Sequence, residues 1–250
     1  MSRLYTASEF FVGPQLEMAE AIERNDMAAL RRGAERGIDL HVRGDRQITL
    51  MWFAMLKENT DAVRTLVELG VHPNESPVEG GGSPLGQALR HQDTRYLEAM
   101  LDGGLSPNDA KDNEGNDKDY PLLFSTITNG TLEHVKLLVD RGADIHYRLN
   151  DGVGSSPFDR STLGTKPEIA IYLLEQGVEP NIRLRTGVTT AWGVFNRIQD
   201  TSGIEREEYL HLRDMMIERG VEFPPPSPVE VRDKMRAEGL TPIVPLGNDR

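Results

Sequence analysis

The sequence contains no cysteine, few aromatic residues and no long apolar run. Without cysteine among its 250 residues, the chain can form neither disulfide bonds nor thiolate nucleophiles nor cysteine-based zinc sites. No segment approaches the ~20 consecutive apolar residues of a membrane-spanning helix, and the first residues lack the apolar stretch of a signal peptide. These absences predict a cytoplasmic protein that does not enter a membrane.

The charge balance is acidic. Lysine and arginine total 28 against 40 aspartate and glutamate residues, which gives a net charge of −12. Such a surface repels phosphate backbones and anionic lipid headgroups, so nucleic acid and membranes are not expected partners. Hydrophobic residues make up 38% of the chain, an ordinary share for a compact fold. We therefore expect a globular protein whose partner has a basic contact surface.

One short block recurs six times: two apolar residues, an acidic residue, any residue, a glycine and an apolar residue. Its second copy is Leu66-Val67-Glu68-Leu69-Gly70-Val71, and the first copy is the weakest. Glycine takes a left-handed conformation without strain, so it often stands just past the end of a helix. Each block therefore predicts a helix end. The marker glycines are Gly37, Gly70, Gly104, Gly142, Gly177 and Gly220, separated by 33, 34, 38, 35 and 43 residues.

This pattern resembles the ankyrin repeat family, whose period is about 33 residues. The family consensus opens the first helix of a unit with Thr-Pro-Leu-His, and the corresponding segments here begin at Thr49, Ser83, Tyr120, Ser156 and Thr190. The resemblance covers about residues 15–223. It implies an all-α fold, an ankyrin-repeat solenoid of six stacked helix-turn-helix units with short hairpin loops, the first and last atypical. Tetratricopeptide-like hairpins, with a similar period but a different residue pattern, are the alternative.

The resemblance also divides the chain. Residues 1–14 form an N-terminal extension, residues 15–223 the repeat array, and residues 224–250 a proline-rich tail that we expect to cap the last repeat. The tail's prolines also form a PxxP pattern, for which a stop to the chain's helical course is the favoured interpretation. In the sixth unit Thr190 stands 30 residues before Gly220, which predicts about nine extra residues around Thr201-Ser202-Gly203, between the two helices.

The residues that could carry chemistry form no recognisable site. The six histidines lack zinc-ligand spacing and are predicted at the surface. Ser83 lies in a glycine-rich segment without the pattern of a nucleophile elbow, and the segment from Asp109 to Asp119 fails the calcium-loop pattern, which leaves an acidic loop suited to a basic partner. We therefore expect no catalytic residues, no cofactor and no metal site. A hydrolase is the least favoured function.

What the resemblance implies about function is protein binding, through the hairpin tips and the exposed side of each first helix, which together line a concave groove. The leading hypothesis is a dedicated inhibitor, similar to bacterial immunity proteins that bind a toxin or enzyme. The alternative is a scaffold, adaptor or host-directed effector that binds several proteins. The family's variable contact positions, carried onto this sequence, are Asp45, Arg46, Ile48, Leu56, Lys57, Glu79, Arg90, His91, Asn116, Asp117, Asp119, Ile127, Thr128, Val153, Ser155, Leu163, Thr186, Thr189, Arg197 and Ile198.

Overall fold

The computed structural model describes residues 5–75, 82–111, 116, 118–152 and 154–244. The chain divides into two compact units: unit 1 comprises residues 1–122 and 129–143, and unit 2 comprises residues 123–128 and 144–250. Both are built from α-helices. Within the described residues there is no strand, and an isolated bridge joins Arg183 and Thr189. The predicted all-α class is confirmed.

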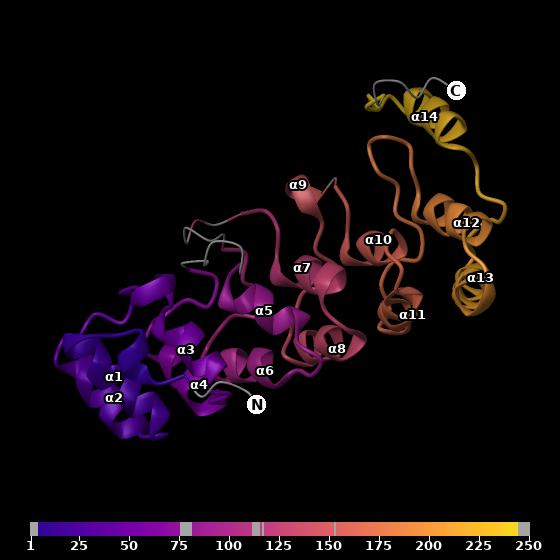
Figure 1. Cartoon of the computed structure of the whole chain (residues 1–250). Coiled ribbons are helices and arrows are strands. Elements are labelled where there is room, and N and C mark those ends of the chain that lie inside the picture. The colour runs from indigo at the N-terminus through magenta and orange to yellow at the C-terminus, as the bar shows by residue number, and fades with distance from the viewer. Residues whose placement is uncertain (1–4, 76–81, 112–115, 117, 153, 245–250) are drawn as a thin grey trace. The chain divides into compact units, whose positions relative to one another are not determined.

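Unit 1 consists mainly of helix pairs that follow one another along the chain (Figure 1). First helices pack on neighbouring first helices and second helices on neighbouring second helices, as a repeat stack requires. The short helix η1 packs on the start of this stack, and η2 precedes the second pair. The pairs are α1 (Gly13–Glu23) with α2 (Met27–Glu35), α3 (Leu50–Leu56) with α4 (Thr60–Glu68) and α5 (Pro84–Arg90) with α6 (Arg95–Asp102); α8 (Leu132–Asp140), η1 (Ala7–Glu9) and η2 (Asp45–Gln47) complete the unit.

Unit 2 repeats this arrangement. Helix α10 packs on α11 and α12 on α13, with α10 against α12 and α11 against α13. Buried side chains such as Phe158, Leu173 and Tyr209 form its core. Most of α7 also belongs to this unit. The elements are α7 (Leu122–Asn129), α9 (Leu149–Gly152), α10 (Pro157–Thr162), α11 (Pro167–Glu175), α12 (Thr190–Asp200), α13 (Gly203–Glu218) and α14 (Pro228–Ala237).

The extra residues of the sixth unit lengthen its helices instead of its loop. Helices α12 and α13 have 11 and 16 residues, against 6 and 9 in α10 and α11, and only Thr201 and Ser202 join them. The predicted insertion between the helices is therefore wrong. The longer helices carry Ile198 and Tyr209 into buried positions, and this burial stabilises helical residues over loop residues.

The glycine-marked blocks end helices, as predicted. All six glycines have positive φ, between +81° and +105°. In the second repeat the Gly70 N–H donates to the Val67 carbonyl and the Val71 N–H to the Leu66 carbonyl, both at 2.9 Å. These two bonds satisfy the last carbonyls of α4. The spacing of these glycines in the sequence is therefore the spacing of helix ends in the structure.

A buried polar contact joins the fifth and sixth repeats. The Asp159 carboxylate, 4% exposed, accepts a hydrogen bond from the Thr190 hydroxyl at 2.7 Å and closes a capping box with Ser156 at the start of α10. Burial raises the pKa of Asp159, because removal from water disfavours the charged carboxylate more than its hydrogen bonds favour it. Asp159 stands at the consensus histidine position, and its contact ties α10 to the start of α12.

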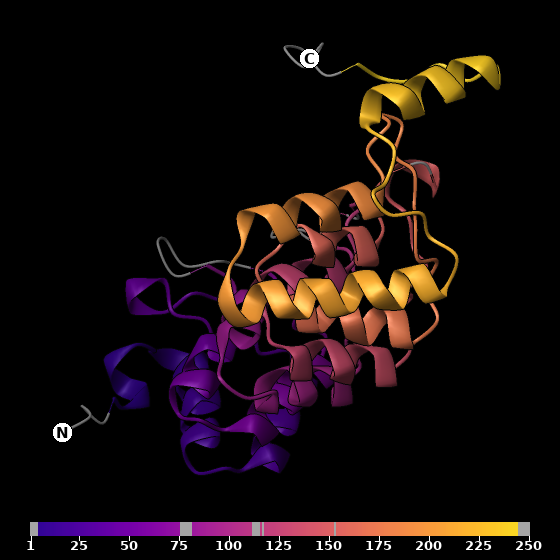
Figure 2. The same ribbon diagram turned by 90° about the vertical axis from the view of Figure 1, so that its right-hand side faces the viewer.

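Helix α14 lies on the hairpin loop that precedes α12 (Figure 2). Arg232, 6% exposed, donates from Nη1 to the Thr186 carbonyl at 3.0 Å. Gly187 allows the close approach, since a β-carbon there would stand 2.5 Å from the Pro228 carbonyl oxygen and 2.7 Å from Arg232 Cγ. The tail thus packs on the loop of the last repeat.

Replacing Gly187 with alanine should displace α14. The added β-carbon clashes with the backbone of Pro228, and the φ of +81° adds about 1 kcal/mol of strain. Amide hydrogen exchange across residues 228–237 should become faster. Gly177→Ala is the control, because its φ of +87° imposes the same strain with no atom within 4 Å. Equal exchange in α14 of both variants would contradict this packing.

The raised pKa of Asp159 predicts the direction in which protein stability changes with pH. A carboxyl whose pKa is higher in the folded state binds protons more readily when folded, so its charge lowers stability at neutral pH and acidification removes that loss. We expect wild type to gain unfolding free energy relative to Asp159→Asn as pH falls from 7 towards 4. Urea unfolding at several pH values measures this difference. A difference that stays constant with pH, or shrinks on acidification, would refute the assignment.

Candidate protein-binding surface

The predicted contact residues that precede the first helices lie in accessible loops. Asp45 and Arg46 are exposed in η2, and the remaining described loop positions are exposed or half-buried. Glu79, Asp117 and Val153 lie outside the described residues. The accessible loop positions are Asp45, Arg46, Ile48, Asn116, Asp119, Ser155 and Thr186.

The C-terminal ends of the first helices form the second set of predicted positions. Leu56 at the end of α3 is 41% exposed, and Leu163, the residue after α10, is 58% exposed. Arg90 and Thr128 are exposed as well. Lys57 is half-buried, because its ammonium group donates to the Tyr5 carbonyl and to Glu23, each at 3.0 Å.

The loop after α5 carries a charged cluster beside His91. Asp93 accepts hydrogen bonds from the Arg95 guanidinium, the shortest at 2.7 Å, and lies 3.1 Å from His91 Nδ1. The hydrogen bond from Arg95 lowers the pKa of Asp93 to about 2. This carboxylate therefore keeps its charge at any physiological pH, and His91 is already engaged.

Three predicted contact residues are buried and require correction: Ile127 (5% exposed), Thr189 (7%) and Ile198 (5%). The fault is one of register. Helix α12 is capped by Thr189, whose hydroxyl accepts from the Trp192 N–H, so the unit starts one residue before Thr190 and its contact positions become Val188 and Asn196. Helix α7 begins at Leu122, which moves the positions of the fourth unit one residue later, to Thr128 and Asn129.

Arg197 is already engaged within the sixth repeat. Its guanidinium donates to Glu205 at 2.7 Å and lies over the Tyr209 ring, 5.5 Å from the centroid. The side chain is half-buried, so we leave it, with the three buried residues, out of the proposed contact set.

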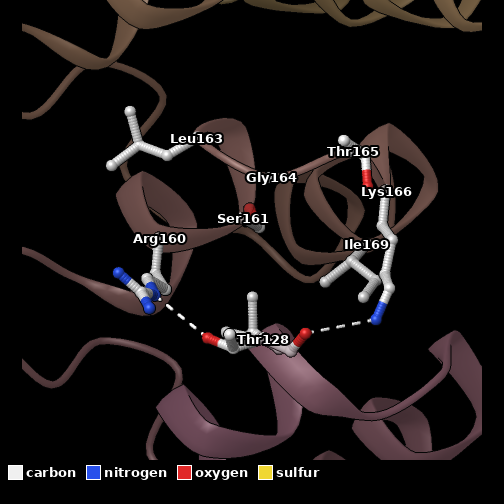
Figure 3. Close-up of a pocket in the computed structure, with 9 residues that line it drawn as sticks. Thr128, Arg160, Ser161, Leu163, Gly164, Thr165, Lys166 and Ile169 are labelled. Carbon is white, nitrogen blue, oxygen red and sulfur yellow. Dashed lines mark hydrogen bonds between the residues drawn. The ribbon is translucent and has the colours of Figure 1, made fainter.

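A cavity of about 290 Å³ opens in unit 2 between the ends of α7 and α10 (Figure 3). Ile127 and Ile169 supply its buried apolar lining, and Leu163 lies at its edge. The volume is at the lower limit of small-molecule pockets, about 300 Å³. It suits one or two side chains of a partner better than a metabolite.

The polar lining of this cavity is cationic. Arg160 Nε donates to the Thr128 hydroxyl at 3.1 Å, and Lys166 Nζ donates to the Thr128 carbonyl at 3.4 Å (Figure 3). Among the described residues that line it there are two cations and no carboxylate. The Thr128 contacts hold both cations beside the apolar floor. We call this site the α7–α10 cavity.

The inter-helix loops of unit 1 enclose a shallow pocket of about 340 Å³ with the opposite charge. Glu23, Glu58 and Asp61 line it together with Lys57, which is paired with Glu23. Glu58 is 76% exposed at its side chain. Asp61 pairs with Arg64 at 2.9 Å, so Glu58 is the most accessible carboxylate of this pocket, and the exposed Leu56 directly precedes its lining residue Lys57.

Residues considered for catalysis or metal binding have structural roles. The Ser83 hydroxyl donates to Asn74 Oδ1 at 2.6 Å and accepts from the Gly86 N–H, so it caps α5. No group of three or more histidines or carboxylates within the described part of the chain could hold a metal ion. Across the same residues, no helix combines the length and apolarity needed to cross a bilayer.

His134 does not lie at the surface, and its prediction as a surface residue was wrong. It is fully buried in α8, where its Nδ1 lies 2.9 Å from the Thr131 hydroxyl in a capping box. Burial lowers the pKa of His134. The ring helps to fix the start of α8, a role that a glutamate or glutamine commonly fills.

Comparisons with known proteins identify the repeats. A family model described as ankyrin repeats (many copies) matches residues 50–101. The ankyrin repeat domain of Bcl-3 superposes with a TM-score of 0.58 at 20% identity, covering 86% of this chain and 92% of that one. An ankyrin repeat domain from Acinetobacter baumannii gives 0.55 at 18% identity, covering 82% and 98%. At these identities the superpositions establish the fold.

Curated relatives match over shorter stretches. Protein PhlB of Serratia liquefaciens is 32% identical over 142 residues, 57% of this chain and 59% of that protein. The E3 ubiquitin-protein ligase KEG of Arabidopsis thaliana is 32% identical over 101 residues, 40% and 6% of the two chains. Human protein phosphatase 1 regulatory subunit 27 is 42% identical over 57 residues, 23% and 36%. The matches thus span about three fifths or less of each relative.

Ankyrin repeat domains are generally protein–protein interaction modules, and the fold implies that role here. The accessible loop residues and first-helix ends lie at the repeat positions expected to contact partners. The helix pairs, the glycine-marked helix ends and the superpositions show that this chain has the ankyrin-repeat fold, and residues 50–101 match the family model of ankyrin repeats.

Proposed function

We propose that the chain is a dedicated inhibitor, of the bacterial immunity type, that binds one toxin or enzyme and blocks it. Most helices of the described residues belong to stacked repeats, a fold that supports protein binding. One relative is by name a regulatory subunit of protein phosphatase 1. The proposal places the partner along the hairpin loops and first-helix ends.

The observation that carries this placement is an exposed leucine at the same repeat position in both units. Leu56 and Leu163 each stand seven residues after the cap of the first helix, Thr49 and Ser156, and expose 41% and 58% of their surface. Leu163 lines the α7–α10 cavity, and Leu56 directly precedes Lys57, which lines the pocket of unit 1. An apolar anchor ringed by polar groups is the usual composition of an interface hot spot.

Charge suggests how the partner meets unit 1. The pocket beside Leu56 is lined by Glu23, Glu58 and Asp61, and the whole chain carries −12. We propose that a basic segment of the partner docks there, since opposite charges speed the encounter and fix the orientation.

Leu163→Asp should abolish capture of the partner. A charge placed against the apolar edge of the α7–α10 cavity must be buried on binding, and loss of a central anchor typically weakens affinity by at least about tenfold. Tagged wild type and variant are compared by affinity capture from the producing organism, followed by titration of the captured enzyme's activity. Ile204→Asp is the control, because Ile204 is 77% exposed on α13 and lines neither the α7–α10 cavity nor the pocket of unit 1.

Wild type and Ile204→Asp should retain one protein and inhibit it stoichiometrically, while Leu163→Asp should do neither. Retention of the same protein by Leu163→Asp would show that the α7–α10 cavity is not the contact. Capture without any loss of the partner's activity would refute inhibition and favour a scaffold.

Neutralising Glu58 and Asp61 should reduce the salt dependence of binding. Without these carboxylates, Glu58→Gln/Asp61→Asn should bind more slowly at low ionic strength and resemble wild type at high salt. The charge-matched control is Glu133→Gln/Asp140→Asn, two exposed residues of α8. The measurement is the association rate with the partner at several salt concentrations. Identical dependence of this rate on salt for the two double variants would exclude binding of a basic segment at this pocket.

A further inference from the structure

A second pocket in unit 2 is assembled by the C-terminal helix. It has a volume of about 330 Å³ and is formed where three distant segments meet. These are the residue before α9, the hairpin loop before α12, and the end of α14 with the chain that follows it. The residues used below are Arg148, Arg183, Leu184, Arg185, Met235 and Leu240. We call it the hairpin pocket.

Hydrogen bonds on three sides fix the pocket. In the middle of α14 Arg232 donates to the Thr186 carbonyl at 3.0 Å, and past the C-terminal end of α14 the Ile243 N–H donates to the Arg185 carbonyl at 2.8 Å. Arg183 Nη1 pairs with Glu238 at 2.9 Å. The hairpin is therefore held along its length by α14 and the residues after it, so the pocket is formed before any ligand arrives.

Three arginines and no carboxylate are among the described residues that line the hairpin pocket. Arg148 is oriented by the Gly154 carbonyl, to which its Nε and Nη2 donate at 3.1 and 3.0 Å. Arg183 forms an ion pair with Glu238. Arg185 is exposed, and its side chain makes no hydrogen bond or ion pair within the described residues. A local excess of positive charge in a chain of −12 marks a place where the partner supplies the anion.

The rest of the lining is apolar. Met235 is buried in α14, while Leu240 is 45% exposed at the opening and Leu184 lies in the hairpin between the two arginines. A guanidinium binds carboxylate in a fork geometry, and the neighbouring apolar surface favours an apolar side chain beside it. Phosphate-rich nucleic acid is disfavoured by the overall negative charge.

We infer that the hairpin pocket binds an acidic peptide segment of the partner protein, with carboxylates on Arg183 and Arg185 and an apolar side chain between Met235 and Leu240. This inference rests on the proposed protein-binding function and adds the chemistry of one partner segment. The α7–α10 cavity, lined by Arg160 and Lys166, has the same sign. The partner then presents basic groups to unit 1 and acidic groups to unit 2.

A peptide probe tests the inference without knowledge of the partner. A fluorescein-labelled peptide of alternating glutamate and leucine is titrated with the full chain, and anisotropy is followed at low and moderate salt. The comparison probes are the same peptide with glutamine for glutamate, and a labelled single-stranded oligonucleotide. We expect saturable binding of the glutamate peptide alone, weakened by salt.

Variants locate the binding. Arg185→Gln changes an exposed side chain that makes no hydrogen bond or ion pair within the described residues. It should weaken binding of the glutamate peptide by about fivefold, the effect of losing about 1 kcal/mol of ion pairing. Leu240→Gln should weaken it without changing the salt slope. Arg213→Gln, which removes the same charge from α13, is the control and should bind as wild type does.

The inference is overturned if the glutamine peptide or the oligonucleotide binds as well as the glutamate peptide. It is equally overturned if no probe binds, or if Arg185→Gln and Arg213→Gln behave alike. If the glutamate peptide does not bind, the result of the Leu163→Asp capture experiment is unaffected. The two proposals can therefore fail separately.

Discussion

The structure depends on one recurring interaction: a side chain of one repeat donates a hydrogen bond to a backbone carbonyl at the end of the preceding repeat's first helix. Asn59 donates to the Ile22 carbonyl at 2.9 Å, Tyr96 to Met55 at 3.2 Å and Tyr209 to Gly164 at 2.7 Å. The Ile22 and Met55 carbonyls also accept backbone N–H groups of their own repeats, so the bond between repeats uses the second lone pair of each oxygen. Neighbouring repeats are therefore joined by directional bonds as well as by apolar burial.

The stacked repeats leave accessible side chains on several surfaces. The hairpin loops and the ends of α3, α5 and α10 keep exposed or half-buried side chains, whereas Ile127 and Ile198 near the ends of α7 and α12 are buried. Leu56 and Leu163 are exposed at two of these ends; the cavity that Leu163 lines is cationic, and the pocket lined by Lys57, the residue after Leu56, is mostly anionic. The net charge of −12 is a total for the whole chain, so it does not reveal the cationic lining in unit 2.

Sequence reasoning succeeded where the signal is local. A glycine after a helix and a hydroxyl before one act through hydrogen bonds three to five residues long, so the helix ends at Gly70 and the starts at Thr49 and Ser83 could be predicted. Sequence reasoning failed where tertiary packing determines at which of two adjacent residues a helix begins. Thr189, not Thr190, caps α12, and the buried face of α12 continues to Ile198, which the consensus spacing did not indicate.

The hairpin pocket was beyond the reach of sequence, because it joins residues about 35 and 50 positions apart whose meeting depends on how α14 packs. The sequence did carry one signal of a cationic site: in a strongly acidic chain, Arg183 and Arg185 stand on either side of Leu184. His134 was missed for a related reason. A histidine inside a capping box is recognisable only when the helix start and its burial are both known.

The partner is proposed to lie along the hairpin loops and first-helix ends. Amide hydrogen exchange of the purified complex, compared with that of the free chain, tests this placement. We expect added protection at the ends of α3, α5 and α10 and in the loops before α3 and α12. Protection confined to the second helices α4, α6, α11 and α13, with the first-helix ends unchanged, would contradict it.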